Sequence, residues 1–343
     1  MPRCIYCLDD KDKDQFNRDH VIPKLLETFE PNNLVLNDCQ VCKACNRFFG
    51  DQIEIWLGRS SFEALMRFQL GQSKLSKFSN YRGYRVNLRV PPGFPWEGAR
   101  LKINADVASG ILFVDLIPQI GVKRPSDQSF RFFTEEEFLA APAEQIGIQR
   151  GSNHCILSPD TSIQERLILL AKSRVPRFRL EGQMQTPPSV DHDGQMTVEI
   201  SAALNNALAR AVAKIAFNYM THVAGNRLTL GPSFSAIRRF IRHDEGPWGD
   251  FVSVNHKPIL ANDGAHYRIT QGHLIVLEWR PQNDDIVVRF SPFNVLTYEI
   301  VLARSCRELW RPIDCGHCFD WESRKVSSLA SSRFPPSPVF RLP

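Results

Sequence analysis

Residues 4–51 carry four short motifs, Cys4-Ile5-Tyr6-Cys7, Asp19-His20-Val21-Ile22-Pro23, Asn33-Leu34-Val35-Leu36 and Cys42-Lys43-Ala44-Cys45-Asn46. A Cys-x-x-Cys turn directs two sulfur atoms to one point, and two such turns supply the four thiolates of a tetrahedral zinc site. We therefore expect structural Zn²⁺ to tie together a segment too short to bury a core of its own, with four ligands: Cys4, Cys7, Cys42 and Cys45. Free or redox-active thiols are the alternative. Cys39 could also pair with Cys42, but the pair Cys42 and Cys45 leads directly into a helical pattern.

The residues between the two thiol pairs predict a strand, a loop, a second strand and a helix. Residues 19–22 form a short extended run that Pro23 closes, and residues 34–36 form a brief apolar strand. The helix is predicted to begin at Asn46 and to run through Ile53 and Leu57. Neighbours on a strand point to opposite faces. Asp19 and His20 can therefore share one metal site only if the strand is distorted or the metal lies at its edge.

In this order and spacing, the motifs resemble an HNH endonuclease of the zinc-ribbon type, which has the ββα-metal fold. The resemblance covers the first fifth of the chain and implies a role for each residue. His20 is the general base, Asp19 is a ligand of the catalytic metal, and Asn33 braces the loop that holds the histidine. Asn46 is the second metal ligand, at a position where the family often has histidine. The oxygen ligands of Asp19 and Asn46 suit Mg²⁺ or Mn²⁺.

Elementary chemistry supports the same interpretation. Hydrolysis of a phosphodiester needs a base for water, a cation on the phosphoryl oxygens and stabilisation of the leaving oxygen. A histidine near its ordinary pKa accepts protons at neutral pH. A lone histidine is usually a structural residue, but His20 has Asp19 and two asparagines at matching intervals.

The whole chain of 343 residues predicts an α+β protein with two domains. Residues 1–72 are the expected HNH nuclease domain with structural zinc, and residues 73–343 are an expected α+β domain with a DNA-binding or regulatory role. The clearest helix is predicted over residues 202–223. Arg210 and Lys214 lie on or beside its apolar stripe, which indicates a core-facing helix and is formed by Leu204, Leu208, Ala211, Val212, Ile215 and Tyr219.

The distribution of charge and the remaining cysteines give less specific information about function. Residues 1–75 hold ten Lys and Arg against eleven Asp and Glu, so the basic excess of this +5 chain lies downstream. On the predicted helix 233–243, three arginines form either a phosphate-binding face or a solvated face: Arg238, Arg239 and Arg242. For Cys306, Cys315 and Cys318, free thiols in a turn are favoured over a second metal or redox site.

We therefore expect a divalent-metal-dependent DNA endonuclease in the cytoplasm. Nine cysteines in metal-like clusters favour a reducing compartment, no secretory signal precedes them, and no apolar run reaches membrane-spanning length. One alternative is a zinc-ribbon module that binds nucleic acid with a vestigial site. Another is a nuclease whose substrate is RNA or a modified base. The C-terminal domain could bind a protein partner or an activating ligand. Free-standing proteins of this family in microbes often resemble parts of anti-phage defence systems or mobile elements, and by that analogy this protein could have such a role.

Overall fold

The computed structural model describes residues 1–26, 28–29, 34–37, 39–81, 86–148, 151–185, 198–260, 272–306 and 315–329. They form two compact units, residues 1–72 together with 204–343, and residues 73–203. Helices and mainly antiparallel sheets in both units confirm the α+β class. Residues 204–343 thus lie in the same compact unit as residues 1–72, whereas residues 73–343 were expected to form one domain.

The first unit is built on a six-stranded antiparallel sheet with the order β11-β14-β13-β12-β15-β16. Its strands are β11 (Val252–Asn255), β12 (His273–Arg280), β13 (Asp285–Ser291), β14 (Thr297–Ala303), β15 (Cys315–Asp320) and β16 (Lys325–Leu329). Helix α6 (Asn206–Ala224) packs on β12, β13 and β14, and α8 (Ser235–His243) packs on β14. The Asn205 side chain caps α6, which ends at Gly225 with φ 83°. The short α7 (Asn226–Thr229) follows.

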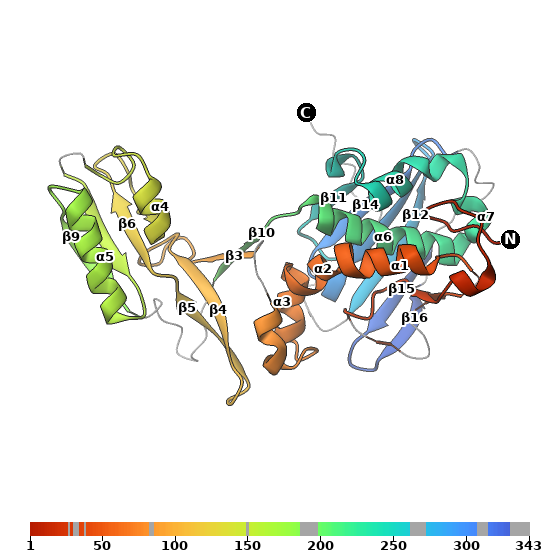
Figure 1. The fold of residues 1–343 in the computed structure, drawn as a ribbon, viewed down its shortest axis with the longest axis horizontal. Coiled ribbons are helices and arrows are strands. Elements are labelled where there is room, and N and C mark those ends of the chain that lie inside the picture. The colour runs from red at the N-terminus through yellow and green to blue at the C-terminus, as the bar shows by residue number, and fades with distance from the viewer. Residues whose placement is uncertain are drawn as a thin grey trace. The chain divides into compact units, whose positions relative to one another are not determined.

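The N-terminal segment covers the other side of α6. Strand β1 (Asp19–His20) pairs antiparallel with β2 (Val35–Leu36), which places Asp19 opposite Leu36 and His20 opposite Val35. Three consecutive helical pieces follow, α1 (Lys43–Phe49), the π-helical turn η2 (Gly50–Glu54) and α2 (Ile55–Arg59), and then α3 (Phe62–Gln69). Because η2 and α2 contact α6, this helix lies between them and the sheet (Figure 1).

One apolar core joins the two ends of the chain in this unit. Ile5 and Phe49 of the N-terminal segment belong to the same buried cluster as Val212 and Phe217 of α6 and Phe290 of β13. Burial of apolar surface is the main favourable term in folding. The N-terminal segment therefore does have a core, but it shares that core with residues more than 150 positions away.

The second unit contains two four-stranded sheets. One has the order β10-β3-β4-β5, from β3 (Val86–Arg89), β4 (Arg100–Asp106), β5 (Ile111–Leu116) and β10 (Glu199–Ala202). The other has the order β7-β6-β8-β9, from β6 (Gln119–Lys123), β7 (Arg131–Phe133), β8 (Asn153–Leu157) and β9 (Leu180–Met184), with β8 and β9 parallel. Helices α4 (Glu135–Ala140) and α5 (Thr161–Arg174) bury Phe138 and Leu167 in a core with Ile120 and Ile156 of the second sheet.

Short 3-10 helices complete the description: η1 (Lys13–Gln15), η3 (Leu75–Asn80), η4 (Pro232–Phe234), η5 (Trp248–Asp250) and η7 (Pro292–Asn294). Within the described ranges, no helix combines the length and the apolar character needed to cross a lipid bilayer.

Candidate active site

The four predicted zinc ligands lie together at one end of the N-terminal segment. Their Sγ atoms all lie within 4.8 Å of one another, and Cys39 is not part of the group. Cys42 precedes α1 directly, and its backbone N–H donates to Cys4 Sγ at 3.4 Å. A hydrogen bond with the Cys45 thiol lowers the pKa of Cys4 to about 5, which favours a thiolate there. Four converging thiols of this kind fit the tetrahedral Zn²⁺ site predicted from their spacing.

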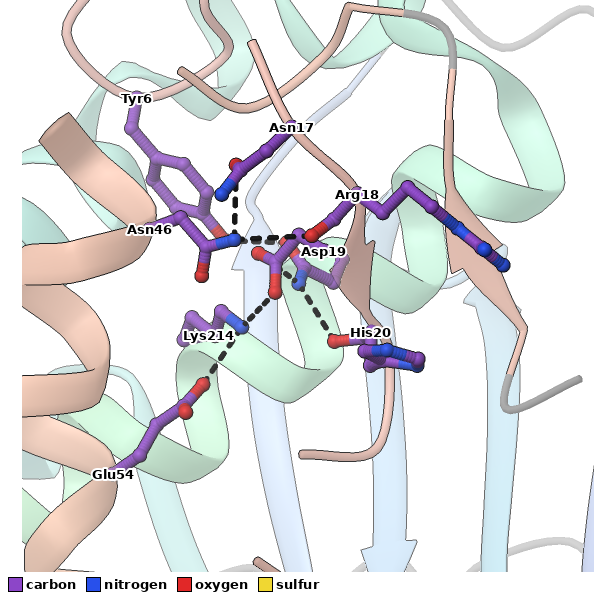
Figure 2. A network of polar contacts seen from close by, with 9 residues as sticks. Tyr6, Asn17, Arg18, Asp19, His20, Asn46, Glu54 and Lys214 are labelled. Carbon is purple, nitrogen blue, oxygen red and sulfur yellow. Dashed lines mark hydrogen bonds and ion pairs between the residues drawn. The ribbon is translucent and has the colours of Figure 1, made fainter. Parts of the chain in front are cut away.

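Strand β1 separates Asp19 from His20, as alternation along a strand requires. Asp19 is only 4% exposed and points toward α6, whereas the His20 ring lies on the other side of the strand (Figure 2). Asp19 Oδ1 accepts a hydrogen bond from Lys214 Nζ at 2.8 Å, and Oδ2 accepts one from Asn218 Nδ2 at 3.0 Å. Lys214 and Asn218 are one helical turn apart, so a single face of α6 holds both oxygens of the carboxylate.

Lys214 is a buried cation between two carboxylates. Its Nζ also donates to Glu54 Oε1 at 2.7 Å, and its side chain is 1% exposed. Burial opposes the charge of the ammonium, but the charges of Asp19 and Glu54 outweigh that effect and raise the pKa of Lys214 above its usual value. The three groups together therefore carry one net negative charge.

Asn218 is itself oriented by a residue of the four-cysteine cluster's first turn. The Tyr6 hydroxyl donates to Asn218 Oδ1 at 2.7 Å, so the amide group must turn its Nδ2 toward β1. That nitrogen also donates to the His20 carbonyl oxygen at 3.2 Å. Tyr6 lies within the Cys4-x-x-Cys7 turn, and this chain of bonds therefore links the turn to both residues of β1.

Asn46 reaches the same side of β1 from helix α1. Its Nδ2 donates to Asn17 Oδ1 at 3.0 Å and to the carbonyl oxygen of Arg18, the residue before Asp19, at 3.1 Å. These bonds use both hydrogens of the amide, which leaves Oδ1 as the atom able to bind an ion. Each oxygen of Asp19 accepts a bond and keeps a further lone pair. Together the two side chains offer only oxygens, which fits a hard divalent cation such as Mg²⁺ or Mn²⁺.

His20 is half-buried, and its surroundings favour the neutral imidazole. Its Nδ1 is buried and makes no hydrogen bond within the described part of the chain. Burial, with a smaller contribution from the charge of Lys24, lowers the pKa of His20 below its usual 6.5, against the opposing influence of Asp19. The imidazole is therefore neutral at pH 7. Asn33, the predicted brace of this loop, lies outside the described residues.

A pocket of about 340 Å³ adjoins the face of the hairpin on which His20 lies. Val35, the partner of His20 across the hairpin, shares that face and contributes to the lining. The other lining residues are Leu34, Asn37, His222, His317, Val326 and Ser328. The Tyr219 hydroxyl of α6 lies 2.7 Å from His317 Nδ1 and fixes the orientation of that ring. The pocket is therefore a concave, partly polar surface beside β2, and His20 is not among its lining residues.

The three arginines of α8 do not form one face. Arg238 is 4% exposed, and its Nη2 donates to the Thr229 carbonyl oxygen at 2.7 Å, so it is a structural residue. Arg239 is exposed and lies 3.5 Å from a carboxylate oxygen of Glu245. The Arg242 guanidinium lies over the ring of Phe48 in α1, with its Cζ 4.1 Å from the ring centroid. Of these three arginines, Arg239 and Arg242 remain candidates for contact with a polyanion.

The cysteines near the C-terminus form no disulfide bonds within the described residues, and Cys315 and Cys318 do not lie in a turn. Cys315 and Cys318 lie on β15, where Cys315 is opposite Leu277 and Cys318 is opposite Leu274. Cys306 is buried. Residues three apart on a strand point to opposite faces. Cys315 and Cys318 therefore do not converge as a metal-binding pair would.

The sequence did not indicate that Lys214, Asn218, Glu54 and Tyr6 belong to this site. One signal was available for Lys214, which interrupts the apolar run of residues 211–217 in the most clearly predicted helix. A lysine in the core-facing stripe of a helix must find anionic partners, because an unpaired buried charge is too costly. The identity of those partners depends on the fold.

Comparison with known proteins supports the N-terminal site alone. Residues 4–62 match a family model described as HNH endonuclease, and this range contains the four cysteines as well as Asp19, His20, Asn33 and Asn46. No curated protein and no solved structure matches the chain. Residues 4–62 are therefore an HNH endonuclease domain with a four-cysteine cluster, which is packed here on a helix from the C-terminal part of the chain.

Proposed function

We propose that this protein is a divalent-metal-dependent endonuclease that hydrolyses phosphodiester bonds in DNA, with His20 as the general base. One observation carries the proposal: β1 pairs with β2 along one edge, and at its other edge the Asn46 amide bonds to the Arg18 carbonyl beside the Asp19 carboxylate, so a cation there lies at the edge of the strand that carries the half-buried His20. The HNH match over residues 4–62 supports the reaction class.

His20 would take a proton from the attacking water. Its lowered pKa keeps the imidazole neutral and able to accept that proton at pH 7. Asp19 and Asn46 would hold the cation, which when bound stabilises negative charge on the phosphoryl and leaving oxygens. Arg18 and Lys24, both exposed, flank His20 in the sequence and would place positive charge where a phosphate approaches it.

The choice of DNA over RNA is the finer part of the proposal. Contacts to a scissile phosphate do not read bases, so the active site itself accepts either backbone. A cytoplasmic location and a role in anti-phage defence or a mobile element extend the proposal by analogy. The vestigial-site alternative is disfavoured, since Asp19, His20 and Asn46 are all present and positioned by hydrogen bonds or strand geometry.

Cleavage assays with a matched histidine variant test the proposal. The full-length protein is incubated with supercoiled plasmid, linear duplex, single strands and RNA, in Mg²⁺, Mn²⁺ or EDTA. His20→Ala should lower the cleavage rate by about 10²- to 10⁴-fold, the usual contribution of a general base. Binding of nucleic acid should change little. His243→Ala, which removes an exposed histidine of α8, should cleave at the wild-type rate.

Three results would contradict the proposal. Full activity of His20→Ala would show that His20 is not the general base, and equal cleavage in EDTA would show that no divalent metal is needed. Cleavage of RNA alone would show that RNA, and not DNA, is the substrate.

A further inference from the structure

We infer that Lys214 is a positioning residue that sets how tightly the Asp19–Asn46 site binds its divalent cation. The nuclease centre would then be completed by helix α6, almost 200 residues beyond the HNH motif. This inference rests on the proposed function, because it assigns Asp19 and Asn46 to the cation.

The burial of Lys214 rules out direct contact with substrate. The residue is 0% exposed, and its ammonium lies 2.8 Å from Asp19 Oδ1 and 2.7 Å from Glu54 Oε1 (Figure 2). A charge in such a place acts on its neighbours through electrostatics and by fixing their orientation. The neighbour nearest the candidate metal site is the Asp19 carboxylate.

The π-helical turn η2 provides the second carboxylate. Turns of this kind insert a residue into a helix and often mark functional sites. Glu54 is the last residue of η2, and its carboxylate lies against Lys214 on the side away from Asp19. The lysine ammonium therefore forms ion pairs with two carboxylates on opposite sides. The three groups together keep a single negative charge, which a cation can neutralise.

Removal of Lys214 should have two effects of opposite direction. The charge of the cluster would change from −1 to −2, which strengthens the attraction for a divalent cation. The Asp19 carboxylate would at the same time lose one of the two bonds that orient it, although Asn218 would still hold Oδ2. Tighter binding of the ion with slower cleavage is therefore the signature of a positioning role. A purely structural role would weaken both.

Direct measurement of Mn²⁺ binding tests this signature without nucleic acid. Free Mn²⁺ is followed by electron paramagnetic resonance in titrations of the zinc-loaded full chain and four variants. Lys214→Gln should lower the Mn²⁺ dissociation constant by about tenfold or more, and Glu54→Gln, which leaves the cluster neutral, should raise it by a similar factor. The double variant Lys214→Gln/Glu54→Gln should lie between the two. Asp19→Asn should abolish the site.

Cleavage at saturating Mn²⁺ supplies the second readout. Lys214→Gln should cleave at least tenfold more slowly than the wild-type protein, and Lys214→Arg should recover part of the loss by restoring the charge. If Lys214→Gln fails to fold, circular dichroism will show it. In that case the Mn²⁺ dissociation constant of Glu54→Gln alone tests the inference, because this variant retains the Lys214–Asp19 pair.

The inference is overturned if Lys214→Gln binds Mn²⁺ no more tightly than the wild-type protein, or if Glu54→Gln leaves binding unchanged. It is also overturned if Asp19→Asn still binds the ion, which would place the ion elsewhere. If Mn²⁺ binds as expected but the wild-type protein cleaves no nucleic acid, the proposed function fails and the inference about the cation stands.

Discussion

The N-terminal segment is held at two places by different chemistry. At the zinc-type cluster, four soft thiols from residues 4–45 converge, and all of them belong to the segment itself. At the Asp19 cluster, the segment supplies Asp19 and Glu54, while the ammonium and the amide come from α6. We expect an ion to stabilise the first place, whereas contacts between distant parts of the chain stabilise the second. The comparison implies that the two places should fail separately, under different treatments.

The sharpest test of this separation is removal of the zinc site, which should have the largest effect on stability. Cys42→Ser should lose the tightly bound ion, of which we expect about one per chain. A structural zinc contributes on the order of 10 kcal/mol to binding and folding together, so a sizeable part of this should be lost. Elemental analysis and thermal unfolding measure the two effects.

Cys39→Ser is the matched control, because Cys39 lies outside the group of four thiols. It should keep its zinc and its stability. Zinc retained at the wild-type level by Cys42→Ser, or lost in Cys39→Ser, would show that the ligands are assigned incorrectly.

The complementary test breaks the second place and leaves the first intact. Lys214→Met should lower the free energy of unfolding by about 3–5 kcal/mol, because it leaves the buried Asp19 carboxylate without its cation. Its zinc content should be unchanged. Lys172→Met, at an exposed position of α5 in the other unit, is the control and should unfold like the wild-type protein. Loss of zinc in Lys214→Met would mean that the two places depend on each other.

The two places also differ in how far the sequence predicts them. The thiol cluster follows from spacing alone, because each Cys-x-x-Cys turn is a local structure. The hairpin of residues 19–20 and 35–36 and the long helix α6 were predicted as well, as was the alternation that separates Asp19 from His20. A helical stripe identifies which residues of a helix share a face, but it does not identify what packs against that face.

This limit explains the parts of the site that were not predicted. Lys214 was placed near the stripe of α6, yet its partner Asp19 is 195 positions away in the sequence. The same limit applies to Arg238, which the sequence groups with two other arginines and the fold buries against the Thr229 carbonyl. Cys315 and Cys318 were expected in a turn, but pairing with β12 holds this stretch as a strand.

A smaller, pH-dependent effect is expected at a third contact between the N-terminal segment and the sheet. His273 of β12 is 0% exposed, its Nδ1 accepts from the Phe293 N–H at 3.2 Å, and its ring lies 5.8 Å from that of Phe29. Burial lowers the pKa of His273 from 6.5 to about 3. Between these values the unfolded chain binds the additional proton, so stability should fall as the pH falls from 6.5 toward 3.

The slope approaches about 1.36 kcal/mol per pH unit below pH 6.5, so stability should fall by about 2.3 kcal/mol between pH 6.5 and 4.5. Denaturant unfolding at several pH values measures it. His273→Asn keeps an acceptor for Phe293 and does not titrate, so its stability should depend less steeply on pH. His256→Asn, at an exposed histidine, should keep the wild-type slope. Identical slopes for the wild-type protein and His273→Asn would show that His273 is not the titrating group.

The smallest expected effect concerns which part of the first unit attracts nucleic acid. Because Arg238 is structural, charge removal on α8 is confined to Arg239→Gln/Arg242→Gln, and it is compared with Arg18→Gln/Lys24→Gln beside His20. Each phosphate contact contributes about 0.9 to the slope of log affinity against log salt. Each double variant that removes two such contacts should therefore bind duplex DNA several-fold more weakly and lower the magnitude of the slope by about 1.8.

Both double variants must be made in the full chain, since the N-terminal segment shares its core with α6 and the sheet. A loss confined to the α8 variant would place the main contact on the C-terminal part of the chain. A loss confined to the Arg18 and Lys24 variant would show that the HNH domain itself attracts its substrate, despite the ten basic and eleven acidic residues of positions 1–75. An unchanged slope in both variants would exclude both surfaces and direct attention to the second unit, residues 73–203.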